Sequence, residues 1–552
     1  MRQRGARNGE AGETGRPRQD TGRVARLTGL AVLAVVASVA AACSSNSGSD
    51  RASQTASDNG ILVTAFHADM GDPDPDIFYA VEGLQVTLSC YQGLLQYQPT
   101  TTNVNTAPIV GLLASSWQVS PDGLTYTFHL RPGLTFADGT KVTASDVEWS
   151  FKRMAKINQG ASYMVAGITG YQTPDASTIV FKLAKPVSAF LSYMASPYGP
   201  KILNEALLLK HQVKSDLGQQ WLQTHSAGTG PYQISQWVTG DHYTLTRNSN
   251  YWGGKPGLAQ IRINIVPDVS SEMLQLSGGS LDLSHDISPE TYAQYASNSQ
   301  FTEIKFADYY LEKLNLNPHK PPFNDIAVRK ALEGAIDKAT LVQQVWGPLA
   351  TPSVQLIPAG MLPAGLGSDT WPSDPGALKA IAATLPASSK KVTIAYQQGA
   401  SQDERMANSV ATILINAGFN ATTQAVPISA TFNYRTSAEA NLPNAELELD
   451  SPDSGSPETF AGIYYRSTGA LDFFHAGDPN ADALMDQGLA ATSTSQANGY
   501  YGQALDLLHS EANFLSLADV DGVMIAKKCL TGYTMMAAAP YYLNLTNAHL
   551  SC

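Results

Sequence analysis

Charged residues are scarce in this chain, and basic residues are scarcer than acidic ones. Asp, Glu, Lys and Arg make up 15% of its 552 residues, and the net charge is −12. Nucleic acid and anionic membrane surfaces attract positive charge, so this balance disfavours both as partners of the folded body. Hydrophobic residues make up 43% of the chain, which at this length indicates a globular protein of two or three domains.

The short motifs of common enzymes are missing as well. The sequence contains no Gly-x-Ser-x-Gly, no His-Glu-x-x-His, no Walker loop and no Cys-x-x-Cys, and its ten histidines show no ligand spacing. Ser388 and Lys391 spell Ser-x-x-Lys, and Ser57 opens a Ser-Asp-Asn tripeptide. Their order is wrong for a penicillin-binding enzyme, and no Lys-Thr-Gly follows. We therefore expect no enzyme, no cofactor and no metal site.

Alternating aspartates follow a predicted strand over residues 61–66. Counted from Asp72, an EF-hand would need Gly at its sixth position and Glu at its twelfth, but Ile77 and Gly83 stand there. Two prolines also interrupt the run. The pattern is better explained as a proline-stiffened turn than as a calcium loop.

No segment is long and apolar enough to span a bilayer. The apolar run over residues 27–42 has sixteen residues, below the roughly 20 that a span needs. Because Arg-rich sequence precedes it and small residues end it, residues 1–42 are predicted to be a signal peptide. Cys43 resembles the acylated cysteine of a lipobox, although Ala40 stands where Leu is usual. The alternative is an ordinary cleaved signal with a cysteine by chance.

Residues 43–59 are polar and without periodicity, so we expect a flexible tether. The protein would then lie on the extracellular face of the cytoplasmic membrane, held by lipid on Cys43. Export leads to an oxidising compartment, where Cys90, Cys529 and Cys552 matter. We expect Cys529 to pair with Cys552 and Cys90 to be a buried thiol; the alternative is three unpaired cysteines.

Two stretches in the first half have clear local patterns. Residues 232–237 and 242–247 flank a Gly240-Asp241 turn and predict a hairpin. Gly228 and Gly230 before it are expected to adopt backbone angles closed to other residues. Further upstream, strands flank Pro121-Asp-Gly123, and a helix begins at Thr143 or Ser145, with Ser145 and Glu148 spaced as a capping box.

The second half predicts more helices. One begins at Asn324 or Asp325. Residues 391–396, 403–417 and 419–426 form a strand–helix–strand unit with Gly418 ending the helix. A late helix over residues 501–514 precedes a final strand over 523–526.

The amino-acid sequences of several stretches resemble those of a known protein family. Gly228-Thr-Gly-Pro-Tyr232 with Tyr251-Trp-Gly-Gly-Lys-Pro256, residues 112–153, and Leu314-Asn-Leu-Asn-Pro-His-Lys-Pro-Pro-Phe323 resemble the family 5 extracytoplasmic solute-binding proteins. These are the oligopeptide- and dipeptide-binding components of ABC importers. The resemblance implies an α/β fold with two lobes of the type II periplasmic-binding-protein kind, an extra subdomain, and closure around a central cleft.

The same resemblance implies a discontinuous division of the chain. Lobe I would comprise residues 60–105, 228–312 and 499–552, with residues 106–227 as its subdomain. Lobe II would comprise residues 313–498. Two strands of chain would cross between the lobes and permit hinge closure.

The resemblance also points to a ligand site within residues 449–460. In peptide-binding relatives an Asp seven residues before a Phe pairs with the α-ammonium group of the ligand, and Asp453 and Phe460 keep that spacing. The alternative is that Asp453 is a plain turn residue. Asp450 stands where relatives often carry Trp, which favours a more cationic ligand. Tyr464 and Tyr465, at strand spacing, are expected to line the cleft, unless one of them belongs to the core.

Dipeptide binders supply a basic residue for the ligand carboxylate from the loop that corresponds to residues 397–403, and none stands there before Arg405. We therefore expect a monomeric lipoprotein that captures oligopeptides rather than dipeptides and delivers them to a membrane permease driven by an ATPase. The alternatives are the same fold with a non-peptide solute (a metal chelate, oligosaccharide or cationic metabolite) and a surface sensor without transport.

Overall fold

The computed structural model describes residues 60–102, 108–285, 288–370 and 372–552. The predicted signal peptide, the tether and Cys43 lie outside the described residues. Within the described ranges, none of the helices combines the length and the apolar character that crossing a membrane requires.

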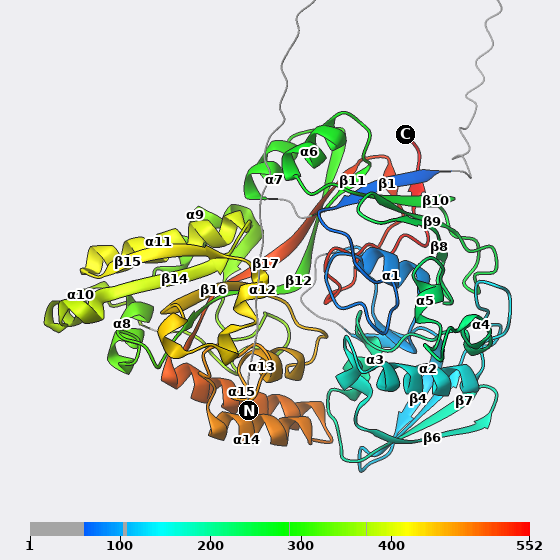
Figure 1. The fold of residues 1–552 in the computed structure, drawn as a ribbon, viewed down its shortest axis with the longest axis horizontal. Helices are drawn as coiled ribbons and strands as arrows, with labels where there is room; N and C mark the ends of the chain where they lie inside the picture. The colour runs from blue at the N-terminus through cyan, green and yellow to red at the C-terminus, as the bar shows by residue number, and fades with distance from the viewer. Residues whose placement is uncertain (1–59, 103–107, 286–287, 371) are drawn as a thin grey trace, which may run out of the picture. The chain divides into compact units, whose positions relative to one another are not determined.

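One large mixed sheet organises the body. Its centre is the pair β12 (Phe301–Leu316) and β17 (Phe514–Lys527), which run antiparallel and side by side (Figure 1). On one side of this pair lie β11 (Leu283–Ser284), β1 (Ile61–Phe66), β10 (Gln260–Ile265), β9 (His242–Arg247) and β8 (Tyr232–Val238). On the other lie β16 (Ala445–Asp450), β14 (Lys391–Gln397) and β15 (Asn420–Val426), while β13 (Ala350–Pro352) pairs with β17. The two longest strands therefore connect both halves of the sheet.

The predicted strand–helix–strand unit is present. β14 and β15 are parallel neighbours joined by α11 (Ser401–Ala417), and Gly418 ends the helix with a left-handed φ of 102°. Met406, Val410 and Leu414 of α11 are fully buried in the core beside this part of the sheet. The helix beginning near residue 324 is α8 (Ile326–Ala335), capped by the Asp325 side chain.

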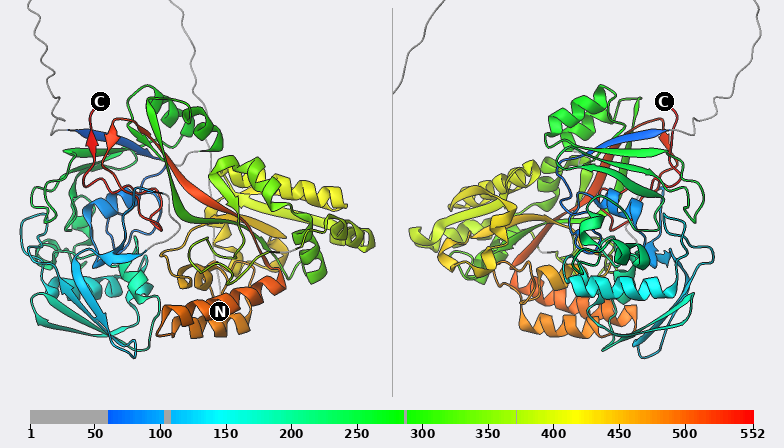
Figure 2. Two further views of the ribbon diagram at one scale, coloured as in Figure 1. Left: turned by 180° about the vertical axis from the view of Figure 1, so that it is seen from behind. Right: turned by 45° about the vertical axis from the view of Figure 1, so that its right-hand side comes forward.

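A separate antiparallel sheet has the order β4 (Ala114–Val119), β5 (Thr125–Leu130), β7 (Thr178–Leu183), β6 (Ile168–Asp175), and both views of Figure 2 show it with α2 against it. The helix α2 (Ala144–Ile157) buries Val147, Phe151 and Met154, as its spacing predicts. The expected capping box was wrong by two residues: Thr143 and Asp146 form it, and the Thr143 amide donates to Asp146 Oδ2 at 2.9 Å.

Two predicted boundaries near the C-terminus were also wrong. The late helix is α15 (Thr494–Glu511), which Ser493 caps, and β17 begins at Phe514, nine residues before the expected start at Val523. Asp519 and Asp521 interrupt the apolar pattern of β17, so the local sequence predicts a strand only after them. Pairing with β12, β13 and β11 keeps the strand continuous.

The glycines before the hairpin have a different role from the one predicted. Neither Gly228 nor Gly230 has a positive φ. A Cβ on Gly228 would instead lie 2.2 Å from the carbonyl oxygen of Cys90, and one on Gly230 would lie 2.3 Å from that of Ser89. Glycine is required here because the chain passes directly against the end of α1 (Leu84–Cys90).

The cysteines are placed as follows. Cys529 and Cys552 form a disulfide with their Cα atoms 5.3 Å apart. It lies beside the short antiparallel pair β18 (Leu530–Thr531) and β19 (His549–Leu550). Cys90 is a buried free thiol. The disulfide thus fastens the end of the chain to the residue that precedes β18.

The alternating aspartates hold a buried arginine. Arg153 of α2 is 2% exposed and donates to Asp74 through both terminal nitrogens, at 2.8 and 2.5 Å, and to Asp76 at 2.5 Å. Its Nε donates to the Leu217 carbonyl at 3.0 Å. Burial raises the pKa of Asp76 to about 7, although Arg153 counters part of the rise. These residues tie the turn after β1 to α2.

Arg153→Met is expected to lower the free energy of unfolding by about 3–5 kcal/mol, because two buried carboxylates would lose their counter-ion. The matched control is Lys152→Met, whose ion pair with Glu148 is on the surface and whose loss is expected to cost less than about 1 kcal/mol. Urea unfolding followed by circular dichroism measures both. Equal small losses would show that the buried cluster adds no stability.

Candidate functional site

Asp453 lies in the loop between β16 and the helix α13 (Glu458–Tyr464). The Thr459 hydroxyl fixes this loop by donating to the main-chain oxygens of Ser454 and Ser456, both at 2.8 Å. Asp453 is 8% exposed. A rigid loop therefore presents one buried carboxylate beyond the end of a central strand.

The hydrogen-bond partners of this loop come from the first 200 residues of the chain. The Tyr163 hydroxyl donates to Asp453 Oδ2 at 2.6 Å, and the Tyr79 hydroxyl donates to the same oxygen. Ser196 Oγ donates to the main-chain oxygen of Asp453 at 2.5 Å, and the Gly455 amide donates to the Tyr97 hydroxyl at 2.7 Å. Segments far apart in the sequence thus meet at Asp453.

Burial determines the protonation of this carboxyl. It raises the pKa of Asp453 to about 6, and the hydrogen bonds from Tyr163 and Tyr79 counter part of that rise. At neutral pH the group is ionised and accepts two neutral hydroxyls without a cation among its hydrogen-bond donors. A carboxylate in this setting can form a charge-assisted bond to an ammonium group.

Aromatic rings surround the carboxylate. Tyr79 is 47% exposed and Tyr163 is 40% exposed. The Tyr79 ring meets Tyr198 edge-on at 5.3 Å, and the Tyr163 ring meets Tyr193 edge-on at 5.7 Å. Aromatic faces attract cations, so both the anion and its surroundings favour a positively charged guest.

A second acidic group lies on β16 itself. Glu446, Glu448 and Asp450 alternate along the strand and therefore share one face. Lys313 of the neighbouring strand β12 contacts Glu448 Oε2 at 2.5 Å and Asp450 Oδ2 at 2.7 Å. Asn315 donates to Glu448 Oε2 at 2.6 Å. The Lys313 ammonium thus pairs with two of the three carboxylates.

The pKa values in this group follow from burial and from neighbouring charge. Burial and the adjacent Glu448 raise the pKa of Asp450 to about 7, which Lys313 partly offsets. Burial alone would lower the pKa of Lys313, but Asp450 and Glu448 outweigh it and raise that pKa. Burial also raises the pKa of Glu446. Asp450, which was predicted from the sequence to border the ligand, is thus paired with Lys313.

The two tyrosines after Asp453 have different environments, and the expected strand spacing was wrong because residues 458–464 form α13. Tyr464 lies with its ring 4.9 Å from Lys313 Nζ, and its hydroxyl donates to the Ser451 carbonyl at 3.3 Å. Tyr465 is completely buried, and its hydroxyl donates to the Leu356 carbonyl. Tyr464 therefore borders the acidic group, and Tyr465 packs in the core.

Two further groups of charged residues could be taken for ligand or metal sites. Arg405, the first basic residue after the β14 loop, pairs with Glu290 on the surface. In the described part of the chain, Glu333, Asp369 and His509 come close enough to share a metal ion. Asp369 is occupied there by Lys338 at 3.2 Å and His509 at 2.8 Å. The hydrogen bonds of Asp369 fit a structural junction between chain segments.

Sequence reasoning missed three residues of this site: Tyr79, Tyr163 and Lys313. Tyr79 follows the turn held by Arg153, and Tyr163 lies in a 3-10 helix (Ser162–Val165) after α2. Neither has a motif of its own. Lys313 could have been recognised as a candidate site residue, because it is a charged residue in the strand sequence directly before Leu314.

Comparison with known proteins identifies relatives of this chain. The chain is 26% identical, over 480 residues, to the probable D,D-dipeptide-binding periplasmic protein DdpA of Escherichia coli strain K12, covering 86% of this chain and 91% of that protein.

Solved structures show the same fold. The periplasmic binding protein DppA from Helicobacter pylori, in complex with the peptide STSA, matches with a TM-score of 0.73 and 22% identity over 90% of this chain and 98% of that one. NikA from Brucella suis, in complex with Fe(III)-EDTA, matches with a TM-score of 0.78 and 20% identity over 89% and 100%. The expected two-lobed α/β fold is confirmed. Because the model of the bacterial extracellular solute-binding proteins, family 5 Middle, matches residues 108–472, the chain belongs to that family.

Proposed function

We propose that this protein is the binding component of an ABC importer and that it captures peptides with a free amino terminus. The observation that carries the proposal is the buried Asp453 carboxylate, whose side-chain hydrogen-bond donors are neutral hydroxyls from distant segments and include no cation. In this scheme the loaded protein docks on a membrane permease driven by an ATPase. It acts as a monomer tethered through lipid on Cys43.

The charge distribution supports a cationic ligand. Lys313 pairs with Glu448 and Asp450 of β16, and Asp453, beyond the end of that strand, has no cation among its hydrogen-bond donors. Such a region repels an anionic chelate and attracts amines. Among the similar structures, the complex with the peptide STSA is therefore a better guide than the complex with Fe(III)-EDTA.

Longer peptides fit this site better than dipeptides. A dipeptide would need a cation for its carboxylate close to the amino-terminal anchor, and the first basic residue after β14, Arg405, is paired with Glu290. A longer peptide carries its carboxylate farther from Asp453. A non-peptide amine remains the second candidate, which the acidic face of β16 favours over neutral solutes.

Binding would proceed by exchange of hydrogen bonds without covalent chemistry. The ligand ammonium takes the place of the Tyr79 and Tyr163 hydroxyl protons at Asp453 Oδ2, and the tyrosine rings then face the cation. Contacts from both sets of segments to one ligand favour the closed arrangement over the open one. The ligand stabilises the closed arrangement because it makes more contacts there than in the open one.

Asp453→Asn is expected to weaken binding of tetrapeptides with free amino termini by about 10- to 100-fold, since a neutral amide replaces the charged acceptor. Calorimetry with a free and an N-acetylated tetrapeptide series measures this change. The control Asp506→Asn, on exposed helix surface, should bind as the unaltered protein does. Equal affinity of the unaltered protein for free and acetylated peptides would contradict the proposed anchor.

Binding should also depend on pH. Because the pKa of Asp453 is about 6, its carboxylate becomes protonated below that pH, and affinity for free peptides should fall about tenfold per pH unit below pH 6. Above about pH 8 the peptide amine loses its proton, and affinity should fall again. Calorimetry from pH 5 to pH 9 tests both limits.

A single substitution tests the assignment of the acidic limit to Asp453. Tyr163→Phe removes a hydrogen bond that lowers the pKa of Asp453, so the acidic midpoint should move to higher pH. Tyr500→Phe, on α15, serves as the matched control and should leave the midpoint unchanged. A midpoint that neither variant moves would assign the titration to another group, such as Asp450.

A further inference from the structure

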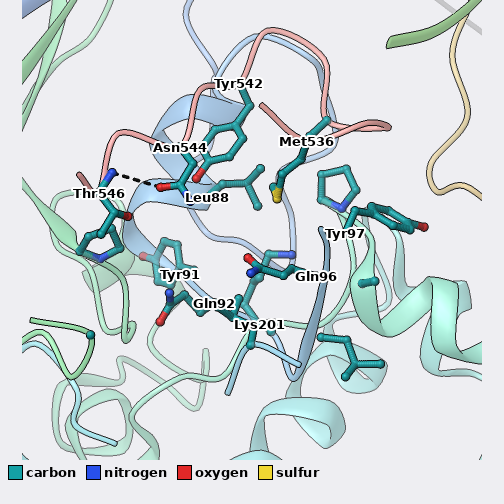
Figure 3. A pocket seen from close by; sticks show the side chains of 18 of the residues that line it. Leu88, Tyr91, Gln92, Gln96, Tyr97, Lys201, Met536, Tyr542, Asn544 and Thr546 are labelled. Carbon is teal, nitrogen blue, oxygen red and sulfur yellow. Dashed lines mark hydrogen bonds between the residues drawn. The ribbon is translucent and has the colours of Figure 1, made fainter. Parts of the chain in front are cut away.

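A cavity borders the segments that hold the Asp453 loop, since Ser196 and Tyr97, which hydrogen-bond that loop, are among its lining residues. It has a volume of about 390 Å³, and its lining residues fall before residue 254 and after residue 535. Figure 3 shows it between the end of α1, β2 (Leu95–Tyr97), Lys201 and the C-terminal segment with Met536 and Asn544. Its volume lies in the range of small-molecule sites. Residues 313–498, which carry Asp453, contribute nothing to its described lining.

The charge of this cavity is opposite to that of the protein. Arg131 and Lys201 line it, and none of the described lining residues is Asp or Glu, although the whole chain has a net charge of −12. Asp76, the acid whose charge acts on Lys201, lies outside the lining and is bound to Arg153. The cavity therefore offers positive charge without a competing carboxylate.

Arg131 and Lys201 both keep donor capacity, and because burial lowers the pKa of Lys201 to about 7, Arg131 is the constant positive charge of the cavity at neutral pH. Lys201 is 4% exposed, and its Nζ donates to the main-chain oxygens of Ser196 at 3.0 Å and Gly199 at 2.9 Å, which accounts for two of its three protons. Arg131 donates from Nε to the Leu112 carbonyl at 2.6 Å and from Nη2 to the Gly111 carbonyl at 3.1 Å. These bonds hold the cations in place and do not involve Arg131 Nη1.

Neutral polar groups complete the lining. Gln92 donates to the Tyr251 hydroxyl at 3.2 Å and accepts from Trp252 Nε1 at 2.8 Å. The Tyr91 hydroxyl is buried, 1% of the residue being exposed, and makes no hydrogen bond within 3.5 Å to a described residue. Burial raises the pKa of Tyr91, and the charge of Arg153 counters part of that rise. Buried hydroxyls are rarely left without a partner.

We propose that this cavity binds a small organic anion rich in hydroxyl groups, of the size and chemistry of a hexuronic acid. Arg131 and Lys201 receive the carboxylate, and Gln92 and Asn544 receive ligand hydroxyls. Aromatic rings such as Trp252 supply the apolar walls that small-molecule sites use. An amino acid fits poorly, because its ammonium group would find no acid in the lining.

The proposal does not rest on peptide binding at Asp453, although Ser196 of the lining donates to the Asp453 main chain, and it is tested without peptide. The probes are D-glucuronate, D-glucose and D-glucosamine, which share one ring and differ in charge. Calorimetry of the mature protein should show that glucuronate binds at least about tenfold more tightly than glucose, with glucosamine weakest. Equal affinity for the three sugars, or no binding of glucuronate at concentrations up to about 10 mM, would overturn the proposal.

Two variants place any glucuronate binding in this cavity. Gln92→Glu adds a like charge at nearly constant shape and should weaken glucuronate binding about tenfold or more, and Gln487→Glu on exposed helix surface is its matched control. Met536→Trp fills the cavity and should abolish binding. Thermal melting verifies that each variant is folded. Binding that survives both cavity variants in folded protein would refute the site.

Discussion

The contact of the buried Asp453 carboxylate with two tyrosine hydroxyls is the interaction on which the proposed peptide site depends. Isolated ionised groups are expensive to bury, and Asp453 is 8% exposed with two phenol hydroxyls as side-chain donors. Those hydroxyls come from the segment after β1 and from the 3-10 helix that follows α2, whereas Asp453 follows β16. The interaction therefore joins distant segments, and it leaves the carboxylate short of a full positive partner.

The surroundings of Asp453 depend on supports that lie elsewhere. Tyr79 follows the turn that Arg153 fastens through Asp74 and Asp76. On the other side, Thr459 locks the loop that carries Asp453. Positioning is thus achieved by ordinary buried hydrogen bonds, which a functional group held to within a fraction of an ångström requires.

Charge is segregated inside the protein. Glu446, Glu448 and Asp450 gather on one face of β16, while Arg131 and Lys201 line a cavity without acids among its described residues. Potentials of opposite sign in separate places allow one chain to discriminate solutes by charge. The proposed peptide site and the proposed anion site follow from this segregation.

Local patterns in the sequence were sufficient for most of the elements. The hairpin of β8 and β9, the β14–α11–β15 unit and the buried stripe of α2 are all set by apolar periodicity and turn residues, which act over a few residues. The family wording identified the two-lobed fold, and the spacing of Asp453 and Phe460 marked the loop. These features are determined by residues close together in the chain.

Tertiary structure decided the rest, because the deciding contacts join residues hundreds of positions apart. Pairing with β12 extends β17 through Asp519 and Asp521, and close packing on α1 explains Gly228 and Gly230 where backbone angle does not. Only the fold brings Tyr79 and Tyr163 to Asp453, and Lys313 to Asp450. Sequence by itself determined which elements form and which acid is available; the three-dimensional packing decided which groups surround that acid, since burial and long-range hydrogen bonds have no local signature.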